Sequence, residues 1–182
     1  MKKVFSIFLF LFIGVFLVEA SVIDSNFVVA KVKAVHDGDS YKVEYWNPDS
    51  TYKHTIWIRL AGVDCPEVKS DVIKEPQPYG VMIGDTLRKM LKDSTIFVKF
   101  IGTDWLYRPL VVVKLNNGQD LASLLLSNGW AWYYSTTLLN KETRNAYQKM
   151  RDKAKKAKKG LWFELNPTNP KDHRKKYYGV AK

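Results

Sequence analysis

The chain has 182 residues, of which 46% are hydrophobic and 26% are charged, so it fits one compact domain with appendages. Cys65 is the only cysteine, which excludes an internal disulfide, and the absence of CxxC and HExxH motifs argues against a zinc site. The net charge of +11 lies near the C-terminus: residues 21–140 hold 13 Lys and Arg against 13 Asp and Glu, and residues 141–182 hold 14 against 4.

This charge distribution indicates a polyanionic partner, because lysine and arginine bind nucleic acid by replacing phosphate counterions. A solvated helix and tail, or attraction to anionic lipid, would give the same count. The charge alone leaves these alternatives open. The three histidines, His36, His54 and His173, are expected on the surface or in turns.

Residues 1–20 have the pattern of a signal peptide. Lys2 and Lys3 precede a run of fifteen apolar residues, and small residues follow where signal peptidase cleaves. An uncleaved anchor is the alternative, although a bilayer span needs about 20 apolar residues. We therefore expect a secreted, periplasmic or cell-surface protein that is monomeric and not stably inserted in a membrane. Its domain would span residues 21–165, followed by a basic tail at 166–182.

The first half of the domain predicts three strands, at residues 27–35, 41–46 and 54–60, from alternating apolar and polar positions. Asp37 and Gly38 stand between the first two and are typical of a hairpin turn. Asp39 follows this turn, where a hairpin requires no second acid, so we expect its side chain to point inward.

The second half predicts strands at residues 95–101 and 110–115 and helices at 80–91, 121–127 and 140–159. In the first helix, Met82 and Met90 belong to an apolar stripe and are expected in the core. Residues beyond 166 show no periodicity and are expected to be extended. The order of elements predicts an α+β, mainly β fold: a five-stranded Greek-key OB-fold barrel with about three helices.

Five polar residues near strand ends stand apart from this barrel pattern: Asp39, Arg59, Asp64, Glu67 and Arg108. Carboxylates with a backbone carbonyl and water suit Ca²⁺, and two arginines can hold phosphate oxygens while a further carboxylate activates water. The spacing is not that of an EF-hand. For residues 59–67 alone, the simpler interpretation is a surface loop with an ion pair, which contributes little to stability.

Six segments, in order and at matching spacing, resemble the staphylococcal nuclease (thermonuclease) family. They lie at residues 36–40, 59–67, 79–80, 104–108, 128–131 and 160–162. The resemblance covers about residues 28–174. It implies an OB-fold and Ca²⁺-dependent hydrolysis of DNA and RNA, with 3′-phosphate and 5′-hydroxyl products.

The resemblance also implies a role for each site residue. Asp39 and Asp64 correspond to the calcium carboxylates, and Cys65 stands where a backbone carbonyl completes the metal site. Glu67, on a loop expected to be exposed, corresponds to the general base. Arg59 and Arg108 correspond to the phosphate-binding arginines. The basic tail is expected to touch none of these groups.

Two segments depart from the family pattern. Leu106 and Tyr107 replace the usual Tyr-Gly before Arg108. The family's base-stacking tyrosines do not align cleanly onto Trp132, Tyr133 and Tyr134. These aromatic side chains are candidates for substrate binding by stacking on bases, although core packing is the preferred interpretation for Trp130 and Trp132.

Three functions compete at this stage. The first is a nuclease, the second a noncatalytic nucleic-acid-binding OB-fold module, and the third a basic surface protein held by an uncleaved anchor. A degenerate binding module would lack one or more of the five polar residues at the strand ends. All five are present, which favours the nuclease.

Overall fold

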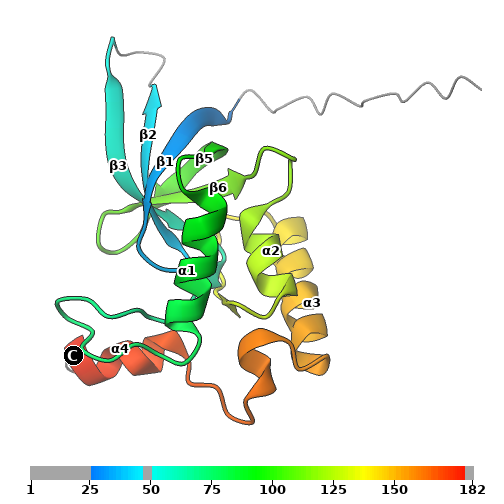
Figure 1. The fold of residues 1–182 in the computed structure, drawn as a ribbon. Helices are drawn as coiled ribbons and strands as arrows, with labels where there is room; N and C mark the ends of the chain where they lie inside the picture. Colours follow the sequence, from blue (N-terminus) through cyan, green and yellow to red (C-terminus); the bar gives the residue numbers. More distant parts are fainter. Residues whose placement is uncertain (1–25, 47–50, 179–182) are drawn as a thin grey trace, which may run out of the picture.

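The computed structural model describes residues 26–46 and 51–178, so the expected signal peptide lies outside the described residues. Five strands close a barrel in the order β1-β2-β3-β6-β5, in agreement with the predicted OB-fold architecture (Figure 1). Neighbouring strands run antiparallel except β3 and β6, which are parallel. The barrel strands are β1 (Val28–Val35), β2 (Ser40–Trp46), β3 (Lys53–Leu60), β5 (Thr95–Thr103) and β6 (Pro109–Lys114).

The barrel forms because β-branched and aromatic residues alternate with polar ones along each strand, which puts one row of side chains inside. Val43, Ile58 and Val98 are fully buried, whereas Trp57, next to Ile58, is exposed on the outer surface. Five predicted strands are therefore confirmed, with ends that differ by one or two residues.

Two further short strands, β4 (Val63–Asp64) and β7 (Trp132–Tyr133), pair with each other outside the barrel. The helices are α1 (Gly80–Leu91), α2 (Leu121–Ser127), α3 (Lys141–Lys156), the 3-10 turn η1 (Gly160–Phe163) and α4 (Pro170–Tyr178). Asp120 and Asn140 cap α2 and α3 by accepting from the backbone N–H of Ser123 and Thr143. None of the helices among the described residues is long and apolar enough to cross a membrane.

The expected burial of the α1 methionines is wrong. Ile83, Leu87 and Leu91 are buried, but Met82 and Met90 are 43% and 40% exposed. The apolar stripe is wider than the face that α1 presents to the barrel, so its edge positions remain in solvent.

The expectation of an extended tail beyond residue 166 is also wrong, because residues 170–178 form α4. Figure 1 shows α4 beside the loop that joins β4 to α1. His173, expected on the surface, is buried there and its Nε2 lies 2.9 Å from the carbonyl oxygen of Glu75. Tertiary contact rather than helical periodicity stabilises this short helix.

Candidate active site

Arg59 lies at the centre of a buried charge cluster. It stands near the end of β3, directly opposite Ser40 of β2, and its side chain is 14% exposed. One terminal nitrogen donates to Oδ1 of Asp39, and the other donates to Oδ1 of Asp64 at 2.6 Å. The two carboxylates therefore meet at one guanidinium group, as the strand-end positions predicted.

Asp39 is fully buried in the turn between β1 and β2, which confirms that its side chain points inward. Its Oδ2 accepts from the backbone N–H of Cys65 at 2.6 Å, and its own N–H donates to Oδ1 of Asp37 at 3.0 Å. A Cβ at Gly38 would lie 2.5 Å from Sγ of Cys65, so glycine allows the turn to approach Cys65, the residue after β4, this closely.

Glu67 follows β4 on the loop to α1, and the expectation that it is exposed is wrong. Its side chain is 12% exposed and accepts from Nη1 of Arg174 at 2.5 Å. Its backbone N–H donates to Oε1 of Gln77, a buried residue farther along the same loop, at 3.0 Å. Asp64, Glu67 and Arg174 thus form one continuous ion-pair network with Arg59.

Arg108 lies outside this network. Its Nε and Nη2 each bind Oδ2 of Asp104 at 2.7 Å, and within the described ranges no ion pair joins it to the carboxylates around Arg59. Leu110 pairs with Arg59 across the β3–β6 ladder, which places Arg108, two residues earlier, at the same end of the barrel. Tyr107 has φ of 60°, a left-handed conformation that costs a bulky residue about 1–2 kcal/mol.

The electrostatic state of the cluster is dominated by burial, which disfavours charged carboxylates. Burial raises the pKa of Asp39 to about 8 despite the opposing charge of Arg59, and it also raises the pKa of Asp37. Burial raises the pKa of Glu67, and the hydrogen bond from Arg174 partly offsets this change. For Arg59, burial by itself would lower the pKa, but the charges of Asp39 and Asp64 raise it.

The donor set of this cluster fits a hard divalent cation. Four carboxyl groups, those of Asp37, Asp39, Asp64 and Glu67, face two guanidinium groups, so the cluster carries excess negative charge when ionised. In the described part of the chain no three His, Cys, Asp or Glu side chains form a metal cluster. Two carboxylates completed by backbone and water oxygens remain compatible with Ca²⁺. Burial raises the pKa of the Cys65 thiol, which keeps it neutral, so its sulfur does not supply a charged ligand.

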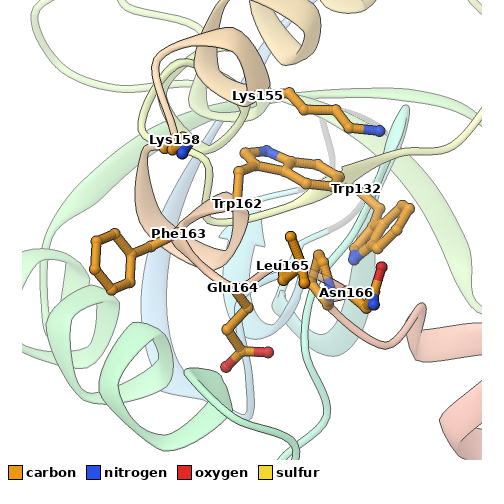
Figure 2. Close-up of a pocket in the computed structure, with 9 residues that line it drawn as sticks. Trp132, Lys155, Lys158, Trp162, Phe163, Glu164, Leu165 and Asn166 are labelled. Atoms are coloured by element: carbon orange, nitrogen blue, oxygen red, sulfur yellow. The ribbon is translucent and has the colours of Figure 1, made fainter.

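The aromatic candidates lie next to the cluster. Trp132 pairs with Asp64 in the β4–β7 ladder, and Figure 2 shows its indole ring against Trp162, with ring centroids 4.6 Å apart. Both rings line an open pocket of about 420 Å³ together with Lys155 and Lys158. Tyr134 is 55% exposed, whereas the hydroxyl of Tyr133 is buried and makes no hydrogen bond with any described residue.

The sequence model of the family described as "Staphylococcal nuclease homologue" matches residues 57–164, more than half of the chain. The chain belongs to the staphylococcal nuclease family. The matched region includes Arg59, Asp64, Glu67 and Arg108 and ends before Arg174.

Several relatives in this family are named as nucleases. The chain is 32% identical over 132 residues to "Probable endonuclease LCL3" of Komagataella phaffii, covering 68% of this chain and 56% of the relative. It is 31% identical over 122 residues to "Staphylococcal-like nuclease CAN1" of Arabidopsis thaliana, covering 67% and 34%. It is 27% identical over 140 residues to an "Uncharacterized endonuclease" of Escherichia coli O157:H7, covering 77% and 80%. The chain thus spans about a third to just over half of these two eukaryotic relatives and four fifths of the bacterial one.

Sequence reasoning missed three residues of this candidate site. Asp37 was interpreted as a turn residue, but its carboxylate also fixes the backbone of Asp39. Gln77 belongs to none of the segments that the sequence singled out, and Arg174 lies in the tail that was expected to touch none of the site residues. Arg174 lies 110 positions from its partner Asp64, and no local pattern marks a contact over that distance.

Proposed function

We propose that the chain is a Ca²⁺-dependent, sugar-nonspecific nuclease that hydrolyses DNA and RNA to 3′-phosphate and 5′-hydroxyl ends. The observation that carries this proposal is the convergence of Asp39 and Asp64 on Arg59, with Glu67 linked to the same network. Family membership and the nuclease names of the relatives support it. A noncatalytic binding module would not need two buried carboxylates at Arg59 with a third carboxylate linked to them.

Each residue has a role that follows from its chemistry. Asp39, Asp64 and the backbone carbonyl of Cys65 would hold Ca²⁺, which when bound supplies positive charge next to the phosphate. Asp39 and Asp64 take two of the five N–H donors of Arg59 in the described part of the chain, which leaves donors for a phosphate oxygen.

Glu67 would accept the proton of the attacking water, since burial shifts its pKa toward the neutral range where a general base works best. Arg108 would bind the phosphate on the leaving-group side after exchanging Asp104 for substrate. Its paired state is compatible with that exchange, because the Arg108 side chain is 33% exposed.

We also propose that the protein acts as a monomer after export, with the segment 1–20 removed, and that substrate is the polyanion gathered by the basic residues of 141–182. Cell fractionation, with N-terminal sequencing of the protein, tests the export step. Recovery of an intact N-terminus in the cytoplasm would contradict it.

The direct test is digestion of plasmid DNA and of RNA by the chain from residue 21 onward, with Ca²⁺ or with a chelator. We expect cleavage of both polymers only with Ca²⁺, and end-group analysis should give 3′-phosphate and 5′-hydroxyl. Binding of both polymers without cleavage would instead support the noncatalytic module.

A further inference from the structure

Arg174 of α4 binds the carboxylates of Asp64 and Glu67, the proposed metal ligand and the proposed general base. Its Nη1 and Nη2 donate to Oδ1 and Oδ2 of Asp64, each at 2.9 Å, and Nη1 also donates to Oε1 of Glu67 at 2.5 Å. Paired hydrogen bonds between one guanidinium and one carboxylate are among the strongest and most directional side-chain contacts. The arginine side chain is 26% exposed, so solvent reaches it from one side.

Independent contacts dock the segment that carries Arg174. Gln77 accepts from the backbone N–H of Glu67 through Oε1 and donates from Nε2 to the carbonyl oxygen of Thr168 at 2.9 Å. This single buried amide therefore joins the catalytic loop to the chain that enters α4. His173 contacts the carbonyl oxygen of Glu75, and Pro170 is buried. The position of Arg174 is thus set by the docking of α4.

The contacts of Arg174 and a bound cation exclude each other. Oδ1 of Asp64 accepts from Arg59 as well as from Arg174, and Oδ2 accepts from Arg174. A cation at Asp64 would therefore compete with Arg174, because Arg174 binds both oxygens of Asp64 whereas Arg59 binds only Oδ1. The same guanidinium covers Oε1 of Glu67, where a water molecule would be deprotonated.

We propose that α4 is an autoinhibitory latch: Arg174 competes with the divalent cation for Asp64 and shields Glu67 until cation binding displaces it. This inference rests on the proposed cation site at Asp39 and Asp64. The exchange suits the geometry of the site, since Arg174 binds both oxygens of Asp64 and one of Glu67, and its departure frees these oxygens for a divalent cation.

The latch can open because α4 is small. A helix of nine residues is marginal by itself and depends on its tertiary contacts. Coupling between two binding events is reciprocal. Docking of α4 therefore lowers the affinity for the cation by the same factor by which the bound cation lowers the stability of the docked α4.

Calcium titration calorimetry on the full chain, without substrate, tests this coupling. We expect Arg174→Gln to bind Ca²⁺ about 5- to 150-fold more tightly than wild type, the usual range for coupled sites. Arg174→Lys keeps the charge but loses the paired hydrogen bonds, so its Kd should lie between the two. Lys175→Gln is the matched control, because Lys175 is exposed and pairs with Asp172 on the same helix. Its Kd should equal that of wild type.

Hydrogen exchange of α4 gives a second readout that does not depend on catalysis. We expect saturating Ca²⁺ to accelerate amide exchange across residues 170–178 in wild type while α1 remains protected. Circular dichroism and thermal unfolding of each variant confirm that the barrel is folded before the constants are compared.

The possible results are distinct. Equal Ca²⁺ affinity in wild type and Arg174→Gln, with α4 exchange unchanged by Ca²⁺, overturns the latch and leaves the nuclease proposal intact. Weaker Ca²⁺ binding together with slower cleavage in Arg174→Gln also overturns it, and makes Arg174 a supporting residue of the site. Absence of Ca²⁺ binding and of Ca²⁺-dependent cleavage in both proteins overturns both proposals.

Discussion

Asp64 and Trp132 are direct partners in the β4–β7 ladder, so a candidate metal ligand and a candidate base-stacking residue stand side by side. Side chains directly opposite each other in an antiparallel pair lie on the same face and about 5 Å apart at Cβ. Substrate held at Asp64 would therefore pass the pocket wall formed by Trp132 and Trp162 (Figure 2).

Replacement of the exposed aromatic residue in this region should weaken binding without loss of stability. Tyr134→Ala is expected to reduce affinity for single-stranded DNA by about 1–3 kcal/mol, the contribution of one base stack. Trp132→Ala should also lower the free energy of unfolding, because its ring packs on Trp162. Fluorescence anisotropy in chelator and urea denaturation measure the two effects. Unchanged affinity in Tyr134→Ala would remove that residue from the binding surface.

Replacement of the proposed base should slow turnover with the fold intact. Glu67→Gln is expected to reduce kcat by about 10²- to 10⁴-fold, the usual contribution of general acid–base catalysis. Glu75→Gln is the control, since Glu75 is an exposed residue of the same loop whose backbone carbonyl, rather than its side chain, contacts α4. The assignment fails if Glu67→Gln cleaves plasmid DNA at a rate near that of wild type.

The raised pKa of Asp39 predicts a pH dependence of stability in the metal-free protein. The folded state holds a proton on Asp39 up to about pH 8, whereas the unfolded chain releases it near the ordinary value of 3.8. The folded state therefore binds more protons between these values, and the free energy of unfolding should fall as pH rises from about 5 to 8. Each unit of pKa difference corresponds to about 1.4 kcal/mol.

Urea denaturation in chelator at pH 5.5 and pH 8 measures this dependence. Asp39→Asn should show a shallower pH slope than wild type by about 1 kcal/mol or more over this interval. The pH slope, rather than the stability at one pH, is compared between the two proteins. The amide of the Asp39→Asn variant also changes the hydrogen bonds to Cys65 and Arg59, and this change alters the stability at every pH. Identical slopes would show that Asp39 is ionised in the metal-free fold.

The basic surface of α4 should contribute to nucleic-acid affinity separately from Arg174. Lys171 and Lys176 are exposed on this helix. Their double replacement by Gln should flatten the salt slope of DNA binding by up to about 0.9 per lost phosphate contact. kcat should be little changed, because neither lysine has a contact with the carboxylate cluster among the described residues.

Lys89 supplies the control for this pair, since it is also exposed but lies on α1. Lys89→Gln is expected to leave the salt slope as in wild type. An unaltered slope in the Lys171 and Lys176 double variant would show that these lysines are only solvated. Truncation after residue 163 would not isolate the effect of these lysines, because it would also remove the contact of Arg174 with Asp64.

The fold and most of the site were predictable because their signals are local. Alternation marked the five strands, and Asp120 and Asn140 marked the starts of two helices. Asp39, Arg59 and Asp64 were predicted to converge because each stands at a strand end, and the structure joins all three.

The remaining features depend on contacts between distant segments. α4 has no helical periodicity and forms where His173 and Gln77 provide partners. Met82 and Met90 belong to the apolar stripe of α1 but lie outside the face that packs on the barrel. The periodicity of the sequence shows the stripe, but it does not show how much of the stripe is buried. The contact of Arg174 with Asp64 crosses 110 positions and is visible only in three dimensions.

Calcium dependence of cleavage, in wild type and in two matched variants, tests the central claim most directly. Asp64→Asn removes a proposed ligand, and Asp71→Asn changes an exposed acid on the neighbouring loop. We predict that wild type and Asp71→Asn cleave a labelled oligonucleotide with half-maximal rates at about 10⁻⁴–10⁻³ M Ca²⁺, as expected of an extracellular site. Asp64→Asn should remain inactive across that range, and Zn²⁺ should not replace Ca²⁺. Full activity of wild type in excess chelator would contradict the account.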